Sequence, residues 1–116
     1  MKKTKIHILS IFLGALASWF GLSSANASCG VNGCTAKIDR IYAKSNGDIL
    51  VNTEGDETQA NCTPPGNIYL TIPWNNTARD TFLAMLLSAK AQDKRLNIRI
   101  FANSPDCEVN YITMDD

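Results

Sequence analysis

The sequence predicts a mainly β fold with one helix, in the order β-β-β-α-β-β. Three observations lead to this prediction: short segments of alternating apolar and polar residues, turn signals between them, and one stretch with helical periodicity. Five strands with a helix between the third and the fourth are the element order of an OB-fold-like small barrel. An open α+β sandwich gives a similar pattern and stays open as the alternative.

The first two strands are expected to form a hairpin. Ala36–Ala43 has the composition of a strand, and Ile41 breaks its strict alternation, which predicts a β-bulge. The Asn46-Gly47 pair then favours a tight turn, since this dipeptide readily takes a positive φ. Ile49–Thr53 returns as the second strand.

A polar loop, Glu54–Pro65, separates this hairpin from the third strand. Asn67–Ile72 is the predicted third strand and ends before a proline. The apolar residues expected to share one of its faces are Ile68, Leu70 and Ile72.

The single helix is predicted over about Ala78–Gln92. Thr77 is the expected N-cap, with Asp80 near the positive end of the helix. The apolar residues spaced i, i+3, i+4 and i+7 are Phe82, Met85, Leu86 and Ala89.

Two further strands complete the predicted fold. Leu96–Phe101 alternates, and its inward side chains are expected to be Leu96, Ile98 and Ile100. Asn103–Asp106 forms a turn, and Cys107–Met114 is the last strand.

Met1–Ala27 has the pattern of a cleaved signal peptide. A lysine-rich start is followed by the mostly apolar stretch Ile6–Leu22, and Ala25-Asn26-Ala27 supplies the cleavage pattern. Cleavage would leave Ser28–Asp116 as one domain, with 8 of the 11 basic residues against all 11 acidic ones, a net charge of about −3. The sequence therefore predicts a periplasmic or secreted protein.

The composition of this mature chain argues against several functions. Its only histidine, His7, would leave with the signal peptide, so Ser-His-Asp and Cys-His catalysis and imidazole metal sites are excluded. No basic run favours nucleic acid, and no remaining segment is apolar enough to span a membrane. We expect no enzymatic activity, no cofactor and no bound metal.

Four cysteines remain after cleavage, and they allow three pairings. We favour Cys62 with Cys107, which would close a long loop and add roughly 4 kcal/mol of stability, and Cys29 with Cys34, which would close a short one. A Cys₄ metal site is the rival interpretation, but its usual pairs of C-x-x-C are absent from the sequence.

Two resemblances add to this interpretation. The segment Thr81–Phe101 resembles the helix-then-strand part of pentameric toxin B subunits of the subtilase-cytotoxin and pertussis-like group. That resemblance implies an exported, disulfide-bonded OB-fold that binds cell-surface glycans.

The mature chain is also similar to small uncharacterised exported proteins of Gram-negative bacteria, which imply no activity. The matching residues are Cys34–Ile38, Gly55–Glu57, Asn61-Cys62, Leu86–Ala89 and Cys107–Val109. No sugar-contacting residue of the B subunits matches a position here, so none is carried over.

Aromatic and amide side chains are the candidate binding residues. Trp74, with Asn75 and Asn76 beside it, could stack on a sugar ring while the amides bond its hydroxyls, or it could pack the loop onto the barrel. Three tyrosines on predicted strands form a binding surface if they share the outer face, and otherwise serve cross-strand packing. These residues are Tyr42, Tyr69 and Tyr111.

Two other features have a structural and a functional interpretation. Arg99 and Phe101 are candidates for a subunit contact, so a homo-oligomer and a monomer both stay open. The acidic run Glu54–Glu57 has oxygen ligands for Ca²⁺ or for acid/base chemistry, but a solvated acidic loop is the favoured interpretation.

The sequence thus predicts a small exported binding module, for a glycan or a receptor in the manner of toxin B subunits. The alternative is a periplasmic protein-interaction, inhibitor or accessory protein without enzymatic activity.

Overall fold

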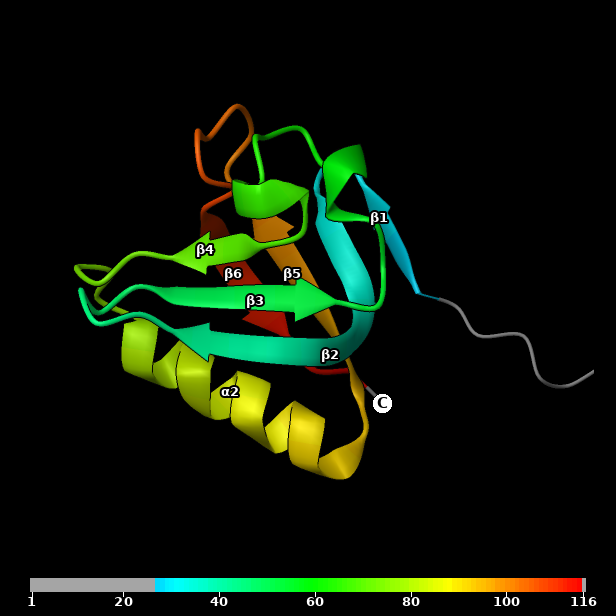
Figure 1. The fold of residues 1–116 in the computed structure, drawn as a ribbon. Coiled ribbons are helices and arrows are strands. Elements are labelled where there is room, and N and C mark those ends of the chain that lie inside the picture. Colours follow the sequence, from blue (N-terminus) through cyan, green and yellow to red (C-terminus); the bar gives the residue numbers. More distant parts are fainter. Residues whose placement is uncertain (1–26, 116) are drawn as a thin grey trace, which may run out of the picture.

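The computed structural model describes residues 27–115, and in this part of the chain six antiparallel strands and one α-helix form a mainly β fold (Figure 1). This confirms the predicted fold class. The predicted signal peptide, Met1–Ala27, lies outside the described residues except for Ala27. The elements are β1 (Ser28–Gly30), β2 (Gly33–Ala43), β3 (Ile49–Thr53), the 3₁₀ turns η1 (Glu57–Gln59) and η2 (Pro65–Asn67), β4 (Leu70–Ile72), α2 (Arg79–Gln92), β5 (Arg95–Ile100) and β6 (Val109–Thr113).

The long strand β2 organises the sheet, whose order is β4-β3-β2-β5-β6. The first half of β2 pairs with β1 on one side and β5 on the other, and its second half pairs with β3. The register shifts between Ile38 and Arg40, where β2 bends sharply (Figure 1). The predicted bulge is therefore confirmed, and it lets Ile41 pack against the core.

A second connection joins the two ends of the sheet. The Thr71 N–H of β4 donates to the Cys107 carbonyl at 2.9 Å, and Thr71 forms a parallel bridge with Glu108, just before β6. Helix α2 lies below the sheet and contacts β2, β5 and β6 (Figure 1). This linkage favours the partly closed barrel over the open sandwich.

The core contains the inward side chains of the strands and one side of the helix. Burial alternates along β5 as predicted, with Leu96, Ile98 and Ile100 inside. On α2, Phe82, Leu86 and Ala89 are buried, and Met85 packs at the edge of the core. Burying each large aliphatic side chain contributes about 1.5–3 kcal/mol, so these rows hold the layers together. Among residues 27–115, no helix is long and apolar enough to cross a membrane.

The third predicted strand is shorter than expected. It begins at Leu70, because Pro65–Asn67 forms a 3₁₀ turn in which Gly66 and Asn67 both have positive φ. The turn changes the direction of the chain before the strand starts, so Ile68 is 42% exposed and Tyr69 is buried. Placing Ile68 on the face of Leu70 and Ile72 was wrong.

The predicted helix cap was also wrong. The N-cap is Ala78, with no capping side chain, and α2 starts at Arg79. The Asn76 side-chain oxygen accepts the Ala78 N–H at 2.8 Å instead, so a turn formed by this asparagine precedes the helix. Asp80 does lie in the first helical turn. Asp93, in the left-handed conformation, ends the helix.

The two predicted disulfides, Cys29–Cys34 and Cys62–Cys107, are both present. The first joins β1 to β2, a strand pair that the sequence analysis did not predict. The second ties the loop before β4 to the loop before β6, where the N–H of Thr63 also donates to the carbonyl of Ser104. The long disulfide therefore holds the same region in which the barrel closes.

Removing the long disulfide is expected to cost more stability than removing the short one. The sequence separations are 45 and 5 residues. From loop-closure entropy, the free energy of unfolding should fall by about 4 kcal/mol in Cys62→Ala/Cys107→Ala and by about 2 kcal/mol in Cys29→Ala/Cys34→Ala. Urea unfolding of the two double variants measures both values. Equal losses, or a larger loss from the short loop, would contradict this role of Cys62–Cys107.

Candidate functional site

The loop around Trp74 is fixed to the β2–β3 hairpin. The Trp74 N–H donates to the Asp48 carboxylate at 2.9 Å, and Nε of Arg79 donates to the Gly47 carbonyl at 2.7 Å. The Trp74 side chain nevertheless stays 64% exposed. Its backbone is thus held in place and the base of its side chain lies close to Gly47 of the hairpin, while most of the indole faces solvent.

The two amides beside Trp74 differ in their contacts. Asn76 is half-buried and uses its side-chain oxygen to bond the Ala78 N–H, whereas Asn75 is exposed. Of the predicted platform, the indole of Trp74 and the amide of Asn75 are exposed, whereas the side-chain oxygen of Asn76 is used within the fold.

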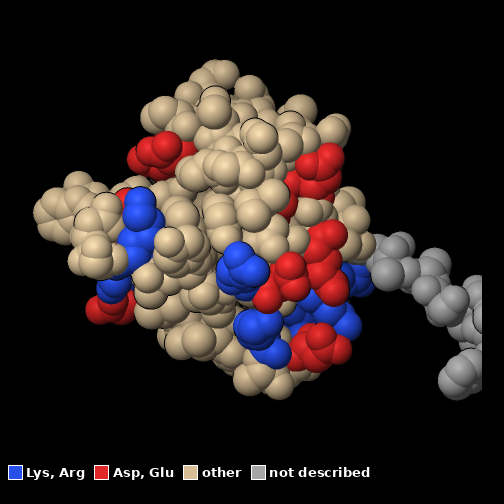
Figure 2. Space-filling view, viewed as in Figure 1, with Lys and Arg blue, Asp and Glu red and all other residues tan. Residues whose placement is uncertain are grey.

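Tyr42 and Tyr69 do come together, with ring centroids 5.8 Å apart in an edge-to-face arrangement. Their polar surroundings are already occupied. Arg40 donates to the Tyr69 hydroxyl at 3.1 Å, and the Asn52 amide donates to the Ile68 carbonyl at 3.1 Å. In Figure 2 the charged side chains gather mostly toward α2 and the bend of β2, and much of the surface over β3 and β4 is uncharged. The polar groups of Arg40, Asn52 and Tyr69 on this face therefore already have partners within the chain.

Tyr111 lies apart from the other two tyrosines, on β6, where it pairs with Arg99 of β5. The register of this strand pair shifts between Arg99 and Ile100, which pairs with the buried Val109. The bulge leaves both Asn110 and Tyr111 exposed, although neighbouring residues of a regular strand point to opposite faces.

A hollow of about 310 Å³ lies beside this bulge. We call it the β5–β6 hollow, and its lining residues are Asn32, Arg99, Ile100, Asn110 and Tyr111. Within residues 27–115, the polar side chains of this lining make no hydrogen bond or ion pair. The other three arginines are all engaged, as Arg40 and Arg79 illustrate. The hollow therefore combines one guanidinium, two amides and one phenol that are free to bond a ligand.

Backbone contacts fix the turn that brings Asn32 to the hollow. The Ile100 N–H donates to the Asn32 carbonyl, and the Asn61 N–H donates to the Val31 carbonyl, both at 3.0 Å. Gly33 has φ +138°, and a Cβ there would lie 2.0 Å from the Ile98 carbonyl oxygen. Only glycine allows the turn to approach β5 this closely. The backbone of the turn is thus fixed by contacts within the chain.

Two residues that line this hollow are also candidates from the sequence, each for a different role. Tyr111 was a candidate binding residue, and Arg99 was a candidate for a subunit contact. Asn32 and Asn110 were missed. Asn32-Gly33 is itself a hairpin signal that could have revealed the β1–β2 turn, whereas nothing local to Asn110 indicates a bulge.

A larger groove, of about 490 Å³, lies near the start of β5. Its polar side chains are partly engaged: the Thr35 hydroxyl donates to the Asn97 side-chain oxygen at 3.2 Å, and Arg95 also has a partner. It has no exposed aromatic ring among its lining residues. The β5–β6 hollow is therefore the better candidate site.

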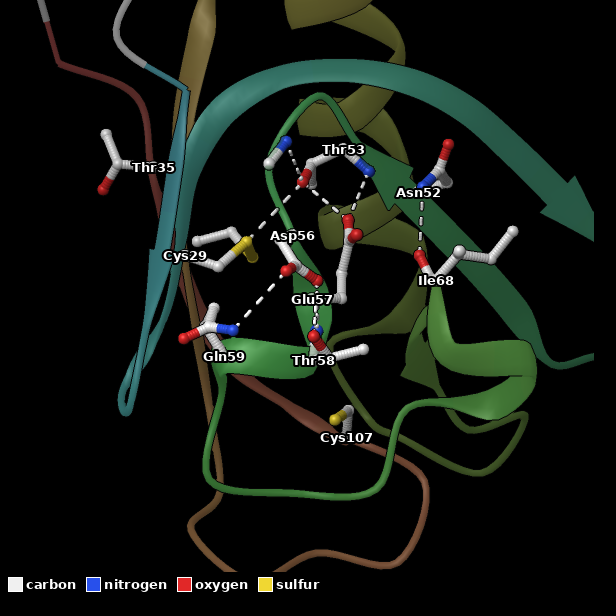
Figure 3. Close-up of a disulfide and its surroundings, with 12 residues drawn as sticks. Cys29, Thr35, Asn52, Thr53, Asp56, Glu57, Thr58, Gln59, Ile68 and Cys107 are labelled. Carbon is white, nitrogen blue, oxygen red and sulfur yellow. Dashed lines mark hydrogen bonds between the residues drawn. A yellow bond between two sulfur atoms is a disulfide. The ribbon is translucent and has the colours of Figure 1, made fainter.

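The acidic loop Glu54–Glu57 is not wholly solvated, although the sequence predicts that it is. Glu57 is only 2% exposed, and its carboxylate accepts the Thr53 N–H and the Thr53 hydroxyl, each at 2.6 Å (Figure 3). The neighbouring Asp56 accepts the hydroxyl and the N–H of Thr58. A wholly solvated loop was the wrong interpretation, because one of its carboxylates is a buried part of the fold.

Comparisons of the chain with models of protein families, with curated proteins and with solved structures find no match. The predicted resemblance to toxin B subunits therefore stays a prediction.

The pKa of Asp56 is expected to lie below its usual value, because the hydroxyl and then the backbone N–H of Thr58 bond its charged form. Its contribution to stability is therefore present above the unfolded-state pKa and is lost as the pH falls through the lowered one. Thr58→Val should raise the pKa part of the way back, as carboxyl-detected NMR titration would measure. Thr63→Val is the control, and an unchanged Asp56 titration in Thr58→Val would refute the role of this hydroxyl.

Proposed function

We propose that this chain is an exported binding module whose β5–β6 hollow holds a glycan. The observation that carries the proposal is the set of unengaged side chains in one hollow. Sugar hydroxyls donate and accept hydrogen bonds, which suits the amides of Asn32 and Asn110 and the guanidinium of Arg99. The apolar face of a sugar ring can stack on the half-exposed ring of Tyr111.

The contrast between the two faces supports this choice of site. OB-fold barrels bind oligosaccharides on the face of their second and third strands, which correspond here to β3 and β4. On that face Arg40, Asn52 and Tyr69 already bond one another or the backbone. A ligand would have to break those bonds, whereas in the β5–β6 hollow it would meet groups without internal partners.

Compartment and chemistry are consistent with a binding role. Two disulfides suit an oxidising space, and the sequence pattern of residues 1–27 predicts export to the periplasm or the medium. The residues lining the hollow include no carboxylate, thiol or aliphatic hydroxyl. We therefore propose that the chain binds its ligand without chemically changing it.

A protein partner is the second candidate. Val31 precedes Asn32 and Phe101 follows Ile100, and both side chains are exposed beside the hollow. Aromatic residues and arginine are typical of binding hot spots between proteins. This observation favours the periplasmic interaction or accessory role if no glycan binds.

The glycan proposal is tested on an array of immobilised glycans. The exported protein should bind a defined subset of the array, and Tyr111→Ala and Arg99→Gln should each weaken binding roughly tenfold or more, the loss of 1.4 kcal/mol or more expected when a central contact is removed. Tyr42→Ala is the matched control, because Tyr42 and Tyr111 are 46% and 48% exposed.

Three outcomes would contradict this proposal. Binding lost in Tyr42→Ala but kept in Tyr111→Ala would place the site on the β3–β4 face. Binding lost in Trp74→Ala alone would restore the platform that the sequence predicts. A wild-type protein that binds no glycan would favour the protein partner. Light scattering of the same sample distinguishes a monomer from a homo-oligomer such as a pentamer.

A further inference from the structure

The short disulfide has a carboxylate beside it. Both sulfurs of Cys29–Cys34 and a carboxylate oxygen of Glu57 lie within 4.8 Å of one another, and Glu57 and Cys34 are buried. The Thr53 hydroxyl lies 3.9 Å from the Cys29 sulfur (Figure 3). Within the described chain, no other group of three cysteine, histidine or acidic side chains gathers in this way.

The buried carboxylate has no cation next to it. Glu57 is almost completely inaccessible, and the ion pairs within residues 27–115 are Lys37 with Asp93 and Arg79 with Asp80. Its bonding partners are the neutral N–H and hydroxyl of Thr53. Buried carboxylates are normally paired with a cation or coordinate a metal. Glu57 thus offers a carboxylate without a cationic partner beside the two sulfurs.

Reduction changes what the two sulfurs can do. A disulfide is a poor ligand, whereas two thiolates beside a carboxylate form a set of the kind that binds Zn²⁺. With a phosphine reductant, the sulfur–sulfur bond breaks, two thiols form, and the phosphine becomes its oxide with an oxygen atom from water. Zn²⁺ then replaces the two thiol protons, which are released.

We propose that the reduced chain holds Zn²⁺ between Cys29, Cys34 and Glu57. The sulfurs must move apart to admit the ion, and β1, a three-residue strand paired only with β2, can shift to allow it. The ion would join β1 to the barrel in the reduced chain, as the disulfide does in the oxidised chain. The sequence predicts no metal site, and this proposal departs from that prediction for the reduced chain only.

Co²⁺ is the probe for this site, because thiolate ligands give it an intense charge-transfer absorption. The exported protein is reduced with the phosphine, titrated with Co²⁺, and then with Zn²⁺ in competition. We expect one equivalent to bind to the reduced protein and none to the oxidised protein. Glu57→Gln, which keeps the shape of the side chain, should weaken binding at least about tenfold.

Variants of the cysteines locate the site. Cys29→Ser/Cys34→Ser should abolish the absorption, and Cys62→Ser/Cys107→Ser should keep it. Circular dichroism with the ion present reports the β fold. The proposal is overturned if the reduced protein shows no thiolate–cobalt absorption, or if the reduced chain stays unfolded with the ion. It is also overturned if Glu57→Gln binds Co²⁺ as tightly as the wild type does, or if Cys29→Ser/Cys34→Ser retains the absorption.

Discussion

The bend of β2 is the constraint on which the rest of the barrel depends. One residue, Asp39, is extra between the pairs Ile38–Thr53 and Arg40–Asn52. A shift of one residue changes the face on which every later side chain lies, so this bulge keeps both Ile38 and Ile41 against one core. The two halves of β2 run in different directions, and β3 and β5 each follow the half with which they pair. The two ends of the sheet meet near Thr71.

A second bulge, between β5 and β6, shapes the surface in the way the first shapes the core. It turns Asn110 and Tyr111 outward together, next to Arg99. The β1–β2 turn completes the hollow only because Gly33 lets it approach β5. The proposed binding site is thus built where two backbone irregularities, a bulge and a glycine turn, lie side by side.

The parts of the fold that follow from local pattern were predictable. Alternation predicted β5, the Asn46-Gly47 turn predicted the hairpin and with it the returning strand β3, and the cysteine pairing agreed with the favoured choice. The parts that depend on distant contacts were not. Glu57 has the sequence context of a solvated carboxylate, yet it is buried because the chain folds back to Thr53 and the β1–β2 disulfide lies beside it. Asn110 lines the hollow because it is the extra residue of the bulge between β5 and β6, which no neighbouring residue indicates.

The most direct test of this account is an NMR titration of the isotope-labelled protein with soluble oligosaccharides. We predict that a bound oligosaccharide shifts the backbone and side-chain signals of Asn32, Arg99, Asn110 and Tyr111 most strongly, while those of Tyr42, Tyr69 and Trp74 change little. Shifts centred on these last three residues, or no shift at the hollow with any oligosaccharide, would contradict the assignment of the β5–β6 hollow as the binding site.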